Sequence, residues 1–270
     1  MREITNKQIK KKGKALINKG YNGNAIVAFV DMLGFSQEIM TKWGGAIDDP
    51  LKRIMEIKGF VKLARQGKAK HTFFDYDLTK ILGTAKYPDL ITISDSFVFL
   101  QTIKKNKDLY FILNLLSVVG SIIELWRVSK DKGFTIRGGI DFGPIFYSKR
   151  EIIGPTFINA YNIESKIADV SRIVLSDNLA KKIYKHQPTI HSTLKDYLLR
   201  YFVEDIDGKV ILNPLIVFGY SDELLDEAMY DFNLMSCNIK RHSAKSKYYD
   251  LLSRLYKRDK GLSKIEIFNK

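Results

Sequence analysis

Two apolar segments of this sequence each end in an aspartate, and this pairing constrains the fold more than any other feature. The run Ala25–Val30 leads into Asp31, and the run Leu90–Ser94 leads into Asp95. Short apolar runs bounded by polar residues are typical of buried strands. If the two strands are neighbours, their carboxylates can share divalent ions, because Mg²⁺ and Mn²⁺ prefer hard carboxylate oxygens. We therefore predict two metal ions held by Asp31 and Asp95.

The residues that follow Asp31 suit a phosphate. Four of them, Met32, Leu33, Gly34 and Phe35, precede Ser36. Gly34 lets the backbone approach a ligand closely, and Ser36 can cap a following helix. Backbone N–H groups at a helix start can hold phosphates beside a carboxylate. We predict a phosphoryl-transfer site with Met32 among its metal-binding positions. Taken singly, strand-end aspartates also commonly start turns or cap helices.

Length and composition favour one catalytic domain with basic tails. The chain has 270 residues, of which 45% are apolar, which suffices for one large or two small domains. We predict a basic N-terminal extension over 1–22, a catalytic domain over 23–220 and a basic helical extension over 221–270. Cys237 is the single cysteine and no secretory signal is recognisable, so we expect a reducing cytoplasm.

The net charge of +14 favours anionic partners without choosing among them. Nucleic acid, an acidic membrane and a triphosphate all qualify. Many cations lie within 221–270, where a solvated helical face explains them as well as a nucleic-acid surface does.

A long apolar stretch, Leu109–Trp126, approaches the length that spans a membrane. Polar residues interrupt it, and lysines and an arginine flank it. We therefore predict a long helix buried in a core or subunit interface, with no stable membrane insertion. Gly133 is the expected end of this helical segment.

The order of the remaining patterns predicts an α+β fold with a mostly antiparallel sheet packed with helices. We expect a strand at 24–30, helices from 36 to about 66, paired strands across 89–101 with a turn at Asp95–Ser96, the long helix, strands at 134–141 and 145–147 joined as a hairpin through 142–144, a helix at 156–170, a strand at 172–175, and a helix that begins at Ser176–Asp177.

Four ordered blocks within 25–176 resemble the class III nucleotidyl cyclases. They are Ala28–Ser36, which resembles that family's first metal motif, Ile91–Asp95 at its second metal aspartate, Ile136–Pro144 at its glycine-proline hairpin, and Ile153–Ser165 at the helix that supplies transition-state residues. The resemblance implies a ferredoxin-like fold, active sites assembled across a homodimer, and attack of a ribose 3′-oxygen on the α-phosphate with release of pyrophosphate.

Some positions depart from the family pattern. The places of its two base-reading residues fall on Ile91, which cannot hydrogen-bond a base edge, and on Glu151, which is a base reader or simply exposed. The place of its transition-state arginine falls on Asn162. Lys166 lies four residues further on the same helical face and is either a substitute cation or a surface lysine. Arg137 is a candidate phosphate ligand or a structural salt-bridge partner.

With the metal aspartates kept and the purine readers missing, the chain looks most like the pyrimidine cyclases of bacterial Pycsar antiphage defence. This resemblance implies conversion of CTP or UTP to cyclic CMP or cyclic UMP, with a separate receptor protein that responds to the product. The sequence does not choose between CTP and UTP. Two alternatives stay open: a purine nucleotide cyclase, and an inactive cyclase-like module that senses a nucleotide.

Overall fold

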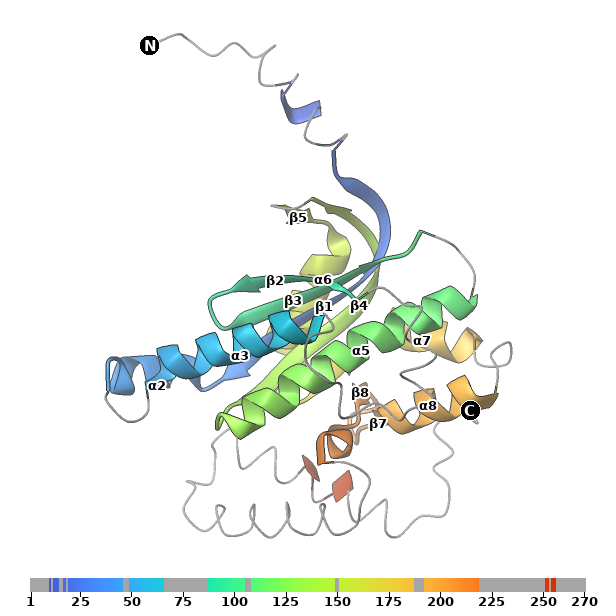
Figure 1. The fold of residues 1–270 in the computed structure, drawn as a ribbon. Coiled ribbons are helices and arrows are strands. Elements are labelled where there is room, and N and C mark those ends of the chain that lie inside the picture. Colours follow the sequence, from blue (N-terminus) through green and yellow to red (C-terminus); the bar gives the residue numbers. More distant parts are fainter. Residues whose placement is uncertain are drawn as a thin grey trace.

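A computed structural model describes residues 19–45, 49–65, 87–104, 108–148, 151–186 and 192–218, together with 10, 12–14, 17, 251, 252, 254 and 255. Its elements are β1 (Tyr21–Leu33), α2 (Phe35–Lys42), α3 (Pro50–Arg65), β2 (Asp89–Ile93), β3 (Ser96–Thr102), α5 (Asp108–Asp131), β4 (Thr135–Tyr147), β5 (Ile152–Ile153), α6 (Pro155–Lys166), β6 (Ile173–Leu175), α7 (Asp177–His186), α8 (Ser192–Tyr201), β7 (Phe202–Glu204), β8 (Val210–Leu212) and a 3₁₀ turn (Pro214–Phe218) (Figure 1).

One mixed sheet organises these elements. Its strand order is β2-β3-β1-β4-β6-β8-β7, and β5 pairs with β4. The pair β4–β6 is parallel, whereas the other pairs of described strands are antiparallel. The unit β1, α2–α3, β2, β3, α5, β4 has the ferredoxin-like order β2-β3-β1-β4. The predicted α+β class with a mostly antiparallel sheet is therefore confirmed, and the homodimer stays a prediction.

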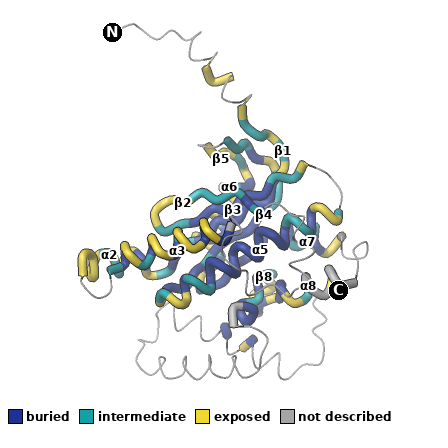
Figure 2. Tube along the Cα trace, in the orientation of Figure 1, coloured by how far each residue is buried: buried dark blue, intermediate teal, exposed yellow. Residues whose placement is uncertain are grey.

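The two faces of the sheet are buried in different ways. Alternate residues of β1 divide between a main core that contains Ile26, Ala28 and Val30 and a smaller core that contains Ala25 and Val27. Helices α3 and α5 cover the main core, and α6 lies on the other face (Figure 1). Figure 2 shows that the sheet and α5 are largely buried, whereas α2 and the outer side of α3 are exposed.

Helix α5 confirms the prediction of a long buried helix. Its length and composition alone would allow it to cross a membrane, but 78% of its most apolar 18-residue window is buried inside the fold. The helical segment ends as predicted at Gly133, whose φ of 77° is readily adopted by glycine and whose N–H donates to the Lys130 carbonyl.

The predicted hairpin at 142–144 is wrong, because β4 continues through it. All thirteen residues of β4 pair with β1, from Thr135 opposite Leu33 to Tyr147 opposite Tyr21. Thr156 Oγ1 donates to the Pro144 carbonyl at 2.9 Å. The backbone carbonyl of Pro144 thus points away from β1, on the side where its N–H would also lie. The lack of an N–H at Pro144 therefore removes no hydrogen bond between β1 and β4. The chain instead reverses after Tyr147, which pairs with Ile152 of β5, and the Ser148 N–H donates to the Glu151 carbonyl.

Other boundaries differ from the predictions by a few residues. Strand β1 continues to Leu33, so Asp31 lies within it, and the helical segment is divided into α2 and α3. The cap of α2 is Gly34 with a φ of 82°, and Ser36 does not serve this role. The β2–β3 turn consists of Ser94 and Asp95, one residue earlier than predicted. Helix α6 ends at Lys166 instead of residue 170, because a tight turn toward β6 follows.

The last described residues belong to the main core. Leu251, Leu252 and Leu255 are at most 6% exposed and pack within it. Apart from 251, 252, 254 and 255, the C-terminal extension expected over 221–270 lies outside the described residues. Cys237 and the predicted helix end at residue 66 lie outside them too.

Candidate active site

Asp31 is held between two strands. The last pair of the β1–β3 ladder joins Val30 to Phe97. One residue beyond this pair, Ser96 Oγ donates a hydrogen bond of 2.8 Å to Asp31 Oδ1. On the other side of β1, Asp31 pairs with Arg137 of β4. The sheet therefore fixes the backbone of Asp31, and Ser96 orients its carboxylate.

Asp95 comes from the hairpin turn beside this strand. It follows Ser94, whose carbonyl accepts a hydrogen bond from Lys58 of α3 and whose φ is 52°. Burial raises the pKa of Asp31, the Ser96 hydrogen bond opposes this effect, and the negative charge of Asp95 raises the pKa further. The two predicted metal carboxylates therefore lie close enough to repel each other, which is the arrangement that a shared cation relieves.

An ion pair between Arg137 and Glu164 completes the group. Arg137 Nε lies 2.5 Å from Glu164 Oε1, and the Glu164 side chain is only 4% exposed. Burial raises the pKa of Glu164, Arg137 lowers it, and the charges of Asp31 and Asp95 raise it again. Arg137 is thus a salt-bridge partner that also lies beside the candidate metal site. No role for Glu164 was predicted from the sequence.

Gly139, two residues after Arg137, lets α6 approach β4 closely. A Cβ atom on Gly139 would lie 2.3 Å from the Ala160 carbonyl oxygen and 2.6 Å from Ile163 Cβ. Gly138 faces the main core instead, where a Cβ atom would lie 2.6 Å from the Phe29 carbonyl oxygen and 3.0 Å from Ile173 Cδ1. A glycine within the strand could have indicated the helix contact, because glycine in a strand often marks a close backbone approach.

The charges of this group fit divalent cations. Three carboxylates, Asp31, Asp95 and Glu164, lie near one another, and the Arg137 guanidinium lies near Asp31 and Glu164. Glu164 is committed to Arg137, which leaves Asp31 and Asp95 as ligands. Among the described residues, no three His, Cys, Asp or Glu side chains form a metal cage. Mg²⁺ commonly takes one or two carboxylates and completes its shell with water and substrate phosphates.

The backbone after Asp31 supplies a second polar feature. The Met32 side chain is 2% exposed, so Met32 can offer a ligand only its backbone. Leu33 is half-buried, Phe35 is buried, and no atom lies within 4 Å of a Cβ built on Gly34. The first N–H groups of α2 begin at this open position, where the helix dipole favours an anion.

Asn162 and Lys166 lie elsewhere. With Asn159 and Lys209 they line a cavity of about 320 Å³ between α6, β6 and the start of α7. Because an α-helix turns about 100° per residue, they point away from the side of α6 that carries Glu164. A single chain therefore does not bring Asn162 and Lys166 to Asp31.

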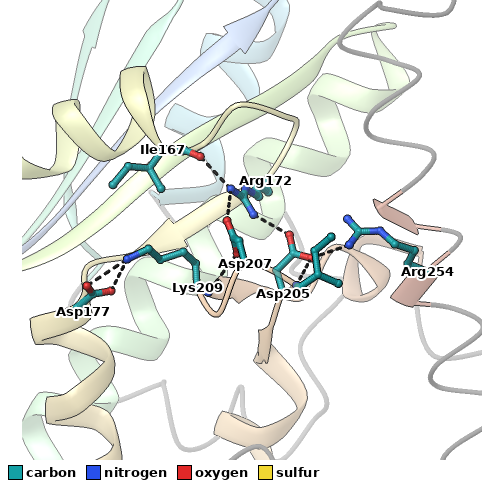
Figure 3. Close-up of polar contacts among 8 residues, drawn as sticks. Ile167, Arg172, Asp177, Asp205, Asp207, Lys209 and Arg254 are labelled. Atoms are coloured by element: carbon teal, nitrogen blue, oxygen red, sulfur yellow. Dashed lines mark hydrogen bonds and ion pairs between the residues drawn. The ribbon is translucent and has the colours of Figure 1, made fainter.

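Ion pairs fix the wall of this cavity that the β7–β8 turn forms (Figure 3). Lys209 Nζ lies 3.0 and 3.1 Å from the two carboxylate oxygens of Asp177. Arg172 donates to Asp205 at 2.7 Å, to Asp207 at 2.8 Å and to the Ile167 carbonyl at 2.9 Å, and Arg254 donates to Asp205 at 3.2 Å. The turn is thereby tied to α6, α7 and the last described helical residues.

Glu151, one of the two expected base-reading positions, is far along the sheet from Asp31, whereas Ile91 pairs with Val98, which in turn pairs with Phe29, two residues before Asp31. Glu151 is exposed and follows the end of β4, where Tyr147 pairs with Tyr21. From Tyr21 to Asp31 the strand advances about 33 Å, at about 3.3 Å per residue. Ile91 is half-buried and packs against the smaller core, so it presents no hydrogen-bonding group.

The raised pKa of Asp31 leads to a prediction about metal binding and pH. A proton competes with a cation for this carboxylate, so Mn²⁺ affinity should begin to fall at a pH above the ordinary aspartate range. In Ser96→Ala the main interaction that lowers this pKa is lost, so the fall should begin at a still higher pH. Titration calorimetry with Mn²⁺ from about pH 7 to about pH 4.5 measures both.

Ser148→Ala, a change in the turn beyond β4, is the control for this prediction and should follow the wild-type curve. Identical pH dependence in Ser96→Ala and the wild type would contradict the role given to the Ser96–Asp31 hydrogen bond.

No protein-family model and no curated protein matches this sequence. Among solved structures, the fold is similar to the monomeric guanylyl cyclase domain of the RhoGC fusion protein from the aquatic fungus Blastocladiella emersonii (TM-score 0.44, 16% identity, 72% of this chain and 96% of that chain). It is also similar to the catalytic core of a rhodopsin-guanylyl cyclase with converted specificity in complex with ATPalphaS (0.42, 17%, 61% and 83%) and to the guanylyl cyclase Cya2 (0.40, 13%, 72% and 92%).

Proposed function

We propose that this protein is a metal-dependent nucleotidyl cyclase that converts a ribonucleoside triphosphate to its 3′,5′-cyclic monophosphate and pyrophosphate. The observation that carries the proposal is the pair Asp31 and Asp95, brought together by strand β1 and the neighbouring β2–β3 turn, beside the open N-terminus of α2. A binding site for a simple anion would not need two carboxylates at this point. A triphosphate with its counter-cations does.

Each residue of the site has a part in this reaction. Asp31 and Asp95 hold two Mg²⁺ or Mn²⁺ ions, which neutralise the triphosphate and lower the pKa of the ribose 3′-hydroxyl when bound. The backbone of Met32–Phe35 binds the β and γ phosphates, and Arg137 lies beside the same group as a phosphate ligand. The 3′-hydroxyl gives up its proton to solvent, its oxygen bonds to the α-phosphorus, the bond from that phosphorus to the bridging oxygen breaks, and pyrophosphate leaves.

The active form in this proposal is a homodimer. Asn162 and Lys166 point away from Asp31 of their own chain, so they can act on a substrate only at another subunit's metal site. The face of the sheet that carries α6 also leaves apolar side chains uncovered: Ile153, Ile158 and Tyr161 are 59%, 55% and 47% exposed. An exposed apolar set beside a smaller core is suited to contact with a second copy.

This proposal predicts the effect of a charge on that face. Ile158→Lys should convert a dimer to a monomer, because burying a lysine in an apolar interface is strongly unfavourable. Met40→Lys, at an 85% exposed position on α2, is the matched control and should stay dimeric. Sedimentation velocity measures both. A dimeric Ile158→Lys, or dissociation of both variants, would contradict the assignment of this face.

For the base we propose a pyrimidine, so that the product is cyclic CMP or cyclic UMP. The support is the half-buried, apolar Ile91 at the position expected to read a purine edge. By its resemblance to pyrimidine cyclases of phage defence, we further place the protein in the cytoplasm, with a separate receptor that responds to the cyclic nucleotide.

The test is incubation of the protein with Mn²⁺ and each of the four ribonucleoside triphosphates, with products identified by mass and Asp31→Ala as the control. A cyclic pyrimidine nucleotide that the variant does not make supports the proposal. A cyclic purine nucleotide would keep the enzyme class and overturn the argument from Ile91.

A second candidate is a cyclase-like module that binds a nucleotide without converting it. It is favoured by Asn162, an uncharged side chain at the position expected to carry the transition-state cation. Metal-dependent triphosphate binding without any product, in a protein shown to be dimeric, would select this candidate.

A further inference from the structure

Glu38 is an unexpected residue in the first turn of α2. This turn is where the proposed function has the triphosphate bind, and the Glu38 N–H closes it by donating to the Gly34 carbonyl at 3.2 Å. A carboxylate here interacts favourably with the helix dipole, but it also repels a phosphate that binds at the same turn. Some other group must therefore neutralise Glu38.

Arg53 of α3 provides that neutralisation. Its guanidinium forms an ion pair with Glu38, and the two side chains are only 15% and 24% exposed. A second bond, 3.0 Å from Arg53 Nη1 to the Lys132 carbonyl, anchors Arg53 to the turn after α5. Lys42 approaches Glu38 only to 4.0 Å. The anchored guanidinium is thus the closer partner of this carboxylate.

The same arginine also supports the first residue of α2. Arg53 Cζ lies 4.4 Å from the ring centroid of Phe134, and Phe134 packs edge-to-face on Phe35 with centroids 5.7 Å apart. Phe35 and Glu38 are three residues apart and so share one side of α2. Arg53 contacts Glu38 directly and supports Phe35 through Phe134.

We propose that Arg53 is a positioning residue for the triphosphate: it fixes the first turn of α2 and neutralises Glu38, so that the N–H groups after Gly34 meet the phosphates without a competing carboxylate. This inference rests on the proposed function. It assigns Arg53 no contact with substrate or metal.

The test compares four variants. Arg53→Met removes the charge and keeps most of the side-chain volume. Lys52→Met is the control, since it removes an exposed charge from the preceding position of α3. Glu38→Gln is made alone and together with Arg53→Met. Calorimetry measures affinity for a non-reactive triphosphate analogue with Mn²⁺, and for Mn²⁺ alone. Hydrogen exchange of the amides of 38–42, the part of α2 whose N–H groups can donate to carbonyls within the helix, is followed in the absence of nucleotide.

Arg53→Met should weaken triphosphate affinity about tenfold, because it leaves a charged hydrogen-bonding group unpaired. It should leave affinity for Mn²⁺ alone within about twofold, because Asp31 and Asp95 are on other elements. Exchange at 38–42 should accelerate. The double variant should regain most of the triphosphate affinity, since the unpaired carboxylate is gone, and Lys52→Met should match the wild type. A purely structural role for Arg53 would not give rescue by Glu38→Gln.

Unchanged triphosphate affinity in a folded Arg53→Met, equal losses in Lys52→Met, or absence of rescue would overturn the inference. If the wild type binds no triphosphate but Arg53→Met accelerates exchange at 38–42, the proposed function fails while the positioning of α2 by Arg53 stands. Should Arg53→Met not fold, Arg53→Lys takes its place: it keeps the charge but not the forked contact, and is expected to lose about threefold in affinity. Wild-type behaviour in both measurements would then overturn the inference.

Discussion

Asp31→Asn is expected to lower turnover about 10³-fold or more while leaving the protein folded. The change keeps an oxygen that can accept the Ser96 hydrogen bond. It removes the negative charge that we propose holds the metal ions, and the loss should fall on the transition state, where the charge on the phosphates is greatest. Single-turnover measurements with saturating Mn²⁺ give the effect on the chemical step. Asp131→Asn, an exposed change at the end of α5, should retain wild-type turnover.

In the absence of metal ions, Asp31→Asn should stabilise the fold, although it lowers turnover. Burial raises the pKa of Asp31 in the folded chain, so its ionised form destabilises the fold. This cost is absent below the ordinary aspartate pKa and appears as the pH rises through the raised value. The variant should therefore be more stable than the wild type near neutral pH, with a difference that disappears in acid.

Thermal unfolding without divalent ions, at several pH values, measures this difference. A variant that is less stable than the wild type at neutral pH would mean that Asp31 is a structural carboxylate. Near-full turnover in a folded Asp31→Asn dimer would exclude the metal assignment.

Gly139→Ala is the second change with a large expected effect, here on stability. The added Cβ would lie 2.3 Å from the Ala160 carbonyl oxygen, a backbone atom that cannot rotate away. Helix α6 would have to move off β4 as a unit, and we expect a loss of about 3 kcal/mol in the free energy of unfolding. Because α6 carries Glu164, its displacement should also disturb Arg137 beside the candidate metal site. Urea unfolding measures the loss.

Gly59→Ala is the matched control, because no atom lies within 4 Å of the new Cβ and the position is exposed on α3. It should stabilise the protein by about 0.5–1 kcal/mol through the helix preference of alanine. If Gly139→Ala unfolded at the same urea concentration as the wild type, the close approach of α6 to β4 would not hold in solution.

Much of the fold could be predicted because its signals are local. The apolar run before Asp31, the helix ended by Gly133 and the helix that starts after Ser176 each depend on residues near in sequence. Ser176 Oγ indeed accepts a hydrogen bond from the Leu179 N–H at the start of α7. Periodicity and capping chemistry suffice for such elements.

The errors occurred where a partner distant in sequence decides the conformation. Glycine and proline at 143–144 favour a turn locally, but the complete ladder with β1 keeps β4 extended. The salt bridge that gives Glu164 its place joins residues 27 positions apart. Asn162 and Lys166 fall on one face of α6 as expected, yet the face turned toward Arg137 carries Glu164. The helical pattern alone could not say which face that is.

The sequence by itself determined which residues are candidates for the chemistry: two aspartates that follow apolar runs, and a glycine where a helix can begin. These are properties of short segments, whose preference for a strand or a helix start depends on residues near in sequence. The tertiary structure alone decided which of these residues meet. Pairing of β1 with both β3 and β4 brings Asp31 to Ser96, Asp95 and Arg137, and Gly139 of β4 admits α6 with Glu164. Such contacts depend on register and on how closely elements pack, which no single segment contains.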